Sequence, residues 1–281
     1  MSSILTNNSA MVALSTLNDV NRGLNETQNR VSSGLKISSG KDNAAYFAIS
    51  ETMSGDSGMF KAINEGLTST KNSVATARLG AETVSGLAEQ FAERVAFAQG
   101  SGVNLDDVQS ELDSLVDQMK AAIEQSTFNG DDMVNAAGVA TPTDTTVTAV
   151  SGIKRSTAGA FSTTTISFEK VDLSAIATAL GAIDLTTSTD IAADLSTAEG
   201  QLAASITAST SLGVSEKTLE GQQAFLESLT DTLDTGVSAM VDADMEEEAA
   251  RLQAYQVQQQ LATQSLSIAN QQPQNILSLF Q

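Results

Sequence analysis

Apolar residues near the start of the chain recur at alternating spacings of three and four between positions 10 and 31. This is the spacing of the seam of a coiled-coil helix, and a helix with such a stripe needs a partner to cover it. The pattern stops at Ser32-Ser33-Gly34, a group of residue types that end helices. We therefore predict a first helix up to this point. Its seam consists of Ala10, Ala13, Leu17, Val20, Leu24, Thr27 and Val31.

The longest periodic stretch runs from Ile63 to Ala98, where apolar and small residues alternate spacings of four and three without interruption. A helix over this stretch is about 54 Å long at 1.5 Å per residue. The group Gly100-Ser101-Gly102 ends it, and a second stretch with the same spacings follows from Leu105 to Ala122. Asp106 lies near the start of that stretch, where the helix dipole favours negative charge. The pattern predicts two long consecutive helices.

The composition changes between Val139 and Ile191, where threonine and serine dominate. Thr164, Ile166 and Phe168 alternate with other residues, which is the period of a strand. We predict short strands in this region, together with one short helix near Ser174 to Leu180. The region is interpreted as a small domain inserted between helices.

Helical spacing then returns, because Leu212, Leu219, Leu226 and Leu233 recur every seven residues. An acidic run from Asp242 to Glu248 precedes or opens a last helix, where negative charge is favourable. The predicted fold is mostly α: a long coiled-coil-like helical rod built from both chain ends, with a small β-rich (α+β) inserted outer domain.

Charge is distributed unevenly along the chain. The net charge is −20, which argues against binding to nucleic acid or insertion into an anionic membrane. The first 18 and the last 30 residues nevertheless contain no charged side chain. Stacked copies would bring like charges together in a desolvated interface, so we interpret both ends as assembly surfaces that pack on each other and on other copies. The predicted interface residues are Ala10, Leu14, Leu17, Val20, Leu24, Val31, Leu252, Leu261, Leu266, Ile268, Leu277, Leu279 and Phe280.

The residue types present exclude several kinds of chemistry. The chain has no cysteine and no histidine, so disulfides, the usual zinc sites and Ser-His-Asp triads are ruled out. The segment from Gly34 to Lys41 fails as a phosphate-binding loop, because five residues separate its glycines and Asp42 follows the lysine. The absence of tryptophan makes a sugar-stacking cleft hard to build. We predict no cofactor, no metal site and no enzymatic activity.

The start of the chain lacks the basic and apolar regions of a secretory signal peptide, and no run approaches the roughly 20 apolar residues of a membrane span.

Three segments of the sequence resemble those of a known family. They are Ile4-Leu-Thr-Asn-Asn-Ser-Ala-Met-Val-Ala-Leu14, Ser32-Ser-Gly-Leu-Lys-Ile-Ser-Ser-Gly-Lys-Asp-Asn-Ala-Ala-Tyr-Phe-Ala-Ile-Ser50 and Ser267-Ile-Ala-Asn-Gln-Gln-Pro-Gln-Asn-Ile-Leu-Ser-Leu-Phe280. Together they resemble the conserved segments of bacterial flagellins. The resemblance covers roughly residues 1–138 and 192–281.

The resemblance implies a structural subunit that self-assembles into the helical flagellar filament used for motility. It implies export by the flagellar type III apparatus without a cleaved signal peptide. It also implies a layered subunit, with 1–45 and 240–281 as the inner assembly layer, 46–138 and 192–239 as the rod layer, and 139–191 as the variable outer domain. Expected partners are the export chaperone, the filament cap and the hook–filament junction proteins, and whether other flagellins share the filament is left open.

Two other functions compete with this one. A hook–filament junction protein has similar ends, and a surface adhesin could display the central region as a binding module. The tail ending in Leu277-Ser-Leu-Phe-Gln, together with the segment at 32–50, favours the filament subunit. The serine and threonine of the central region suit either strands with a solvated surface or O-linked sugars.

The resemblance also bears on immune recognition. In flagellins that an innate receptor detects, a helical segment resembling Arg-Glu-Leu-Ala-Val-Gln is the part that the receptor reads. The corresponding segment here begins Glu93-Arg94-Val95, with the acid and the base exchanged. A receptor carboxylate would then meet Glu93 in place of an arginine, so we predict weak or no activation.

Overall fold

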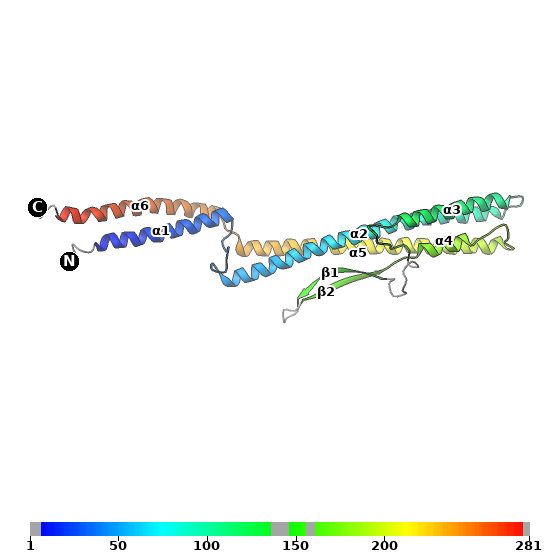
Figure 1. Cartoon of the computed structure of the whole chain (residues 1–281), viewed down its shortest axis with the longest axis horizontal. Helices are drawn as coiled ribbons and strands as arrows, with labels where there is room; N and C mark the ends of the chain where they lie inside the picture. Colours follow the sequence, from blue (N-terminus) through cyan, green and yellow to red (C-terminus); the bar gives the residue numbers. More distant parts are fainter. Residues whose placement is uncertain (1–6, 136–145, 156–160, 278–281) are drawn as a thin grey trace. The chain divides into compact units, whose positions relative to one another are not determined.

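The computed structural model describes residues 7–135, 146–155 and 161–277, with side chains as far as Gln271. In this part of the chain there are six helices and one two-stranded antiparallel sheet, so the predicted fold class is confirmed (Figure 1). In chain order the elements are α1 Asn8–Ser33, α2 Ala44–Ala98, α3 Leu105–Gln125, β1 Thr146–Arg155, β2 Phe161–Glu169, α4 Leu173–Gly181, α5 Ile191–Val241 and α6 Met245–Leu277.

The chain divides into two compact units. Unit 1 comprises Met1–Ser57 and Asp231–Gln281, and unit 2 comprises Gly58–Thr230. Helices α2 and α5 therefore each contribute to both units. The residues of the predicted insert belong to unit 2, together with the helices on either side of them in the sequence.

Helix α2 starts earlier than its apolar pattern predicted. It begins at Ala44, where the side chain of Asn43 accepts hydrogen bonds from the backbone N–H groups of Ala45 and Tyr46 at 3.1 and 3.2 Å. Between this start and Ile63 the sequence contains Gly55 and few regularly spaced apolar residues. The Asn43 cap starts the helix, and adding residues to a helix that already exists is favourable. Helix α2 therefore includes the segment before Ile63, although that segment has no regular apolar stripe.

The core of unit 2 is made of the predicted stripes. Nine of the predicted α2 positions are buried, from Leu67 to Ala98, and they pack in one cluster with residues of α3, α4 and α5. Phe91 is the largest fully buried side chain among the described residues. Small residues elsewhere let the helices approach closely: a Cβ built on Gly80 of α2 would lie 1.9 Å from the Ser126 hydroxyl oxygen after α3.

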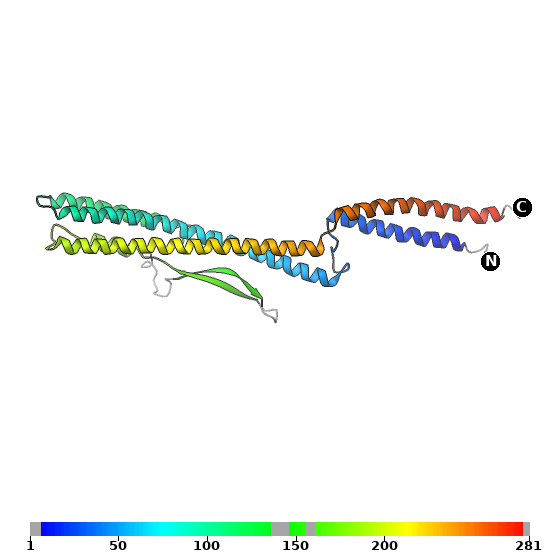
Figure 2. The ribbon, with the colours of Figure 1, turned by 180° about the vertical axis from the view of Figure 1, so that it is seen from behind.

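The predicted strands and short helix are also present. Strand β1 pairs with β2 from Thr146 opposite Glu169 to Arg155 opposite Phe161, with a bulge at Ser151. The side chain of Gln222 on α5 donates a 2.7 Å hydrogen bond to the Ser151 carbonyl, which ties the hairpin to the helices beside it (Figure 2). Helix α4 is capped by Asp172 and is buried along one side against the core. The hairpin and α4 thus pack on the long helices of unit 2.

Candidate assembly interface

Helices α1 and α6 of unit 1 lie side by side and antiparallel (Figure 1). Near one end of the pair, the Asn7 side-chain amide donates to the Ala269 carbonyl at 2.8 Å. In the middle, the Gln259 amide donates to the Asn21 side-chain oxygen at 2.7 Å. At the other end, the Arg30 guanidinium lies 3.3 Å from a Glu248 carboxylate oxygen. The two ends of the sequence therefore form one helical hairpin, as the uncharged stripes led us to expect.

Backbone hydrogen bonds join the two chain segments at the end of this pair where α1 ends and α6 begins. Helix α1 ends where Gly34 takes a left-handed conformation (φ 73°) and its N–H bonds to the Arg30 carbonyl at 2.8 Å, which confirms the predicted end. The N–H of Lys36 donates to the Val241 carbonyl at 2.7 Å, and the N–H of Ala243 donates to the Gly34 carbonyl at 2.9 Å. The α1–α2 loop and the α5–α6 loop are thereby joined.

The predicted α1 seam faces α6 within the same chain. Ala13, Val20 and Thr27 are buried, and the intervening seam residues are half-buried. The matching seam of α6 was not predicted from the sequence, because several of its members are polar or aromatic. The feature that could have revealed it is the continuous alternation of four- and three-residue spacings. Its residues are Glu248, Leu252, Tyr255, Gln259, Ala262, Leu266 and Ala269.

Glu248 is the charged member of this seam. Its side chain is 6% exposed, and one carboxylate oxygen is 3.3 Å from Arg30 and 3.4 Å from Arg251. The other carboxylate oxygen is buried and has no hydrogen-bond partner. The acids before it open α6 as expected, because the Asp244 side chain accepts a hydrogen bond from the Glu246 N–H at 3.0 Å. Glu248 itself, however, acts in the packing between α1 and α6.

A second group of apolar residues remains uncovered on the same two helices. Each has between 49% and 64% of its surface exposed, although all lie in or next to the uncharged ends of the sequence. Large apolar side chains that gather on a soluble surface commonly mark an interaction site. The group consists of Met11, Val12 and Leu14 on α1 and Val257, Leu261 and Ile268 on α6.

The structure thus separates the predicted interface residues into two sets. Leu14, Leu261 and Ile268 are exposed. The seven in the second set are buried or half-buried on the side where α1 and α6 meet: Ala10, Leu17, Val20, Leu24, Val31, Leu252 and Leu266. Leu279 and Phe280 lie outside the described residues, and the side chain of Leu277 is not described.

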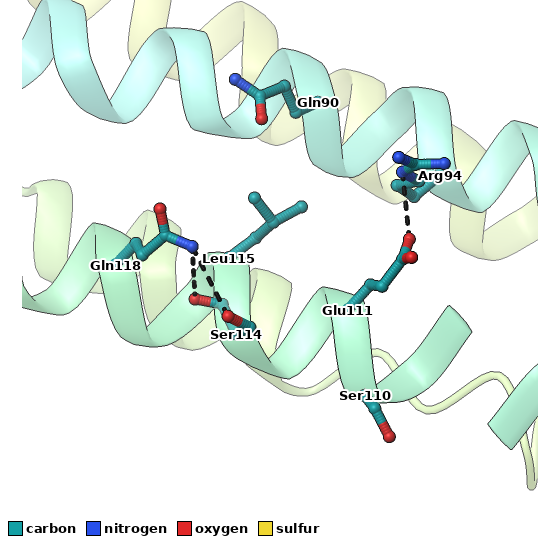
Figure 3. Close-up of a pocket in the computed structure, with 7 residues that line it drawn as sticks. All are labelled: Gln90, Arg94, Ser110, Glu111, Ser114, Leu115 and Gln118. Atoms are coloured by element: carbon teal, nitrogen blue, oxygen red, sulfur yellow. Dashed lines mark hydrogen bonds and ion pairs between the residues drawn. The ribbon is translucent and has the colours of Figure 1, made fainter. Parts of the chain in front are cut away.

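The predicted receptor segment lies on α2 in unit 2, beside a groove between α2 and α3 (Figure 3). Glu93 and Arg94 are exposed, whereas Val95 is fully buried in the core. The Arg94 guanidinium is ion-paired with Glu111 of α3 at 3.1 Å, and Leu115 lies beside this pair in the groove. Of these three residues, Glu93 and Arg94 are therefore available at the surface.

The described residues 7–135, 146–155 and 161–277 also bear on metal binding and membrane insertion. No group of three or more acidic, histidine or cysteine side chains in these ranges is arranged to hold a metal ion. None of the helices described there combines the length and the apolar character needed to cross a membrane.

Comparison with known proteins agrees with this architecture. The family model for the bacterial flagellin N-terminal helical region matches residues 4–138, and the model for the bacterial flagellin C-terminal helical region matches residues 195–280. A flagellin of Brucella melitensis is 35% identical over 287 residues, which cover 100% of this chain and 99% of the relative. Flagellin FljM of Caulobacter vibrioides is 35% identical over 288 residues, with coverage of 100% and 99%. Flagellin C of Rhizobium meliloti is 32% identical over 323 residues and is covered completely.

The family models identify the helical regions at both ends of the chain as those of a structural subunit of the flagellar filament. The chain belongs to the bacterial flagellin family, and the resemblance noted in the sequence is confirmed. The matches do not favour a hook–filament junction protein or an adhesin, because both family models and the full-length relatives are flagellins.

Proposed function

We propose that this flagellin joins the filament through the exposed apolar residues of α1 and α6, while the buried seam holds these two helices together within each subunit. In this proposal, residues 1–45 and 240–281 form the inner assembly layer. Residues 46–138 and 192–239 form the rod layer, and residues 139–191 form the outer part. The observation that carries the proposal is the coincidence of exposed apolar side chains with the uncharged stretches of the sequence.

The energetics favour such a contact. Covering a Leu or Ile side chain that is exposed in the free subunit gains up to about 1.5–3 kcal/mol. Leu14, Leu261 and Ile268 are each 49–60% exposed, so each would contribute part of this amount. Because no charged side chain lies in the first 18 or last 30 residues, an interface there carries no cost for desolvating an ion.

The family supports the remaining parts of the proposal. A flagellar filament subunit has a structural role, and we assign this chain no catalytic activity and no cofactor. We further propose export by the flagellar type III apparatus to the extracellular filament. The expected contacts are with an export chaperone, the filament cap and the hook–filament junction proteins.

The test is elongation of filament seeds by purified subunits. Leu261→Asp places a charge in the proposed interface at a position that is 60% exposed, so the helices should stay folded by circular dichroism while elongation stops. Ala121→Asp is a matched control, because it adds one charge at an exposed position on α3, among residues that are already acidic. Normal elongation by the Leu261→Asp subunit would contradict the proposal.

We also propose that the exchanged charges at Glu93 and Arg94 weaken recognition by the innate receptor. The engagement of Arg94 by Glu111 supports this, because the guanidinium already has an acidic partner on its own chain.

A further inference from the structure

Methionine is the principal target for oxidants in this chain. The sequence contains no cysteine, no histidine and no tryptophan, whereas it contains eight methionines and two tyrosines. A methionine thioether is oxidised to a sulfoxide, and a methionine sulfoxide reductase reverses the reaction. Oxidation of the side chains therefore falls first on methionine sulfur.

The described methionines differ widely in exposure. Met119 and Met133 are at most 2% exposed and lie in the core of unit 2. Met59 and Met245 have 36% and 46% of their surfaces exposed, and Met11 has 64%. Among the residues that the structure describes, Met11 is therefore the methionine that an oxidant in water reaches most easily.

Met11 also lies within the apolar surface that is proposed to join subunits. Its neighbours on α1 are Val12 and Leu14, which are 62% and 49% exposed, and the first charged residue of the chain is Asp19. The N–H of Met11 donates to the Asn7 carbonyl at 3.1 Å, so the residue is held at the first turn of the helix. A change in the polarity of this side chain would therefore alter the proposed interface directly.

Oxidation makes the Met11 side chain polar without adding charge. With hydrogen peroxide as the oxidant, the O–O bond breaks, one oxygen forms a bond to the sulfur and the other leaves as water, so the sulfur loses two electrons. The sulfoxide oxygen accepts hydrogen bonds, whereas the side chains of Val12 and Leu14 donate none. Covering an acceptor that has no donor is costly. A sulfoxide at position 11 therefore opposes the contact that the thioether favours.

Met245 on α6 provides a contrast. It is 46% exposed, but it lies between Asp244 and Glu246 in the sequence, and both of these acids are exposed as well. Water already solvates this acidic part of the surface, so an oxygen added to Met245 stays hydrated. The effect of oxidation therefore depends on where the methionine lies.

We propose that Met11 is an oxidation site that controls entry of the subunit into the filament. Sulfoxide formation in the free subunit blocks assembly. A thiol-dependent methionine sulfoxide reductase restores it, because the oxygen leaves as water while two thiols become a disulfide. In the filament the thioether is covered and protected. This inference rests on the proposed function of the exposed α1 and α6 residues and adds a chemical control of that same surface.

Seed elongation after peroxide treatment tests the proposal. Unmodified, Met11→Leu and Met245→Leu subunits are treated with hydrogen peroxide, and mass spectrometry measures the sulfoxide at each methionine. Relative to the untreated subunits, elongation by the unmodified and Met245→Leu subunits should slow by about tenfold or more, and elongation by Met11→Leu should change little. Reductase treatment should restore the two sensitive subunits. Equal sensitivity of the two variants, or unchanged elongation when Met11 is fully oxidised, would overturn the proposal.

A second measurement follows protection of Met11 in the filament. The rates of sulfoxide formation at Met11 and Met245 are compared in free subunits and in filaments, and the ratio of the two rates should fall by about tenfold on assembly. An unchanged ratio would show that Met11 is not covered and would also overturn the proposal.

The Leu261→Asp subunit separates failure of this proposal from failure of the proposed function. If untreated subunits elongate seeds and Leu261→Asp subunits do not, while peroxide has no effect, only the proposal for Met11 fails. Normal elongation by Leu261→Asp subunits overturns the proposed function itself.

Discussion

The ring of Tyr255 on α6 lies directly over the backbone of Gly23 on α1. A Cβ built on Gly23 would be 2.6 Å from the Cζ atom of the ring and 2.9 Å from its hydroxyl oxygen. Any larger residue at position 23 must therefore push the ring out of the seam. This contact fixes how α1 and α6 lie along one another, together with the Asn21–Gln259 hydrogen bond two residues away in α1.

Gly23→Leu is expected to lower the thermal unfolding midpoint of unit 1, although leucine is the better helix former by about 0.8 kcal/mol. The reason is the displacement of Tyr255 from the seam. Adding Tyr255→Ala should restore much of the loss, because it makes room for the new side chain. Gly55→Leu on α2 serves as the control: nothing lies within 4 Å of a Cβ at that glycine, so the same change should not destabilise. Equal effects at positions 23 and 55 would rule out the packing argument.

Arg30→Leu should destabilise the helical hairpin by about 1–3 kcal/mol, because it removes a partner from a buried carboxylate. Glu248 is 5% exposed, and among the described residues Arg251 is the charged partner that remains after this change. Arg22→Leu is the control, since the Arg22–Asp19 pair is largely exposed and such pairs contribute about 0–1 kcal/mol. Urea unfolding followed by circular dichroism measures both. A change at Arg30 no larger than that at Arg22 would show that burial of Glu248 has no energetic consequence.

The α1–α2 loop should loosen in acid. The backbone N–H of Ser38, and then the hydroxyls of Ser38 and Ser39 and the second backbone N–H, hold the pKa of Asp42 below its usual 3.8. A carboxyl whose pKa is lowered by folding stabilises the folded form above its unfolded pKa and loses this effect as the pH falls through the folded value. Hydrogen exchange at Ser38 and Ser39 should therefore accelerate below pH 3.8 relative to neighbouring amides. In Asp42→Asn this pH dependence should vanish; if it persists, another group is responsible.

The hairpin β1–β2 should be dispensable for assembly, whereas α4 should not. The Val171 N–H donates to the Met133 carbonyl at 3.0 Å, so the segments flanking the hairpin already touch and a short Gly/Ser linker can replace residues 136–169. Extending the replacement to residue 191 also removes Leu173, Leu180 and Leu185, which are at most 1% exposed. We expect filaments from the first variant by electron microscopy and a destabilised unit 2 in the second. Similar stability of the two variants would show that α4 adds nothing to the core.

Exchanging the charges on α2 should raise receptor activation. The double variant Glu93→Arg with Arg94→Glu restores the order found in recognised flagellins and gives up only the exposed Arg94–Glu111 pair. A reporter assay with free subunits should show weak activation by the unmodified chain and stronger activation by the variant. Lys120→Glu on α3 controls for a change of surface charge at a distance. Strong activation by the unmodified chain would refute the charge argument.

The apolar stripes of α2 and α5 could be predicted from the sequence because burial inside unit 2 requires apolar residues at regular spacings. The α6 seam could not, because Glu248, Tyr255 and Gln259 occupy positions that are apolar in an ordinary coiled coil. Nor could Leu14 be separated from Leu17 on α1, since a residue that packs within the chain and one left exposed for a neighbour have the same chemical character. The early start of α2 depends on the Asn43 cap and carries no periodic signal.

The pairing of α1 with α6 also has a consequence for the time at which the subunit can fold. The contacts that join these helices link residues between 218 and 262 positions apart. A ribosome makes α1 first and α6 last, so α1 exists without its partner for nearly the whole of synthesis. Its seam, from Ala10 to Val31, stays open to other molecules until α6 has been made. The order of synthesis therefore makes this stretch of the nascent chain the one most in need of protection.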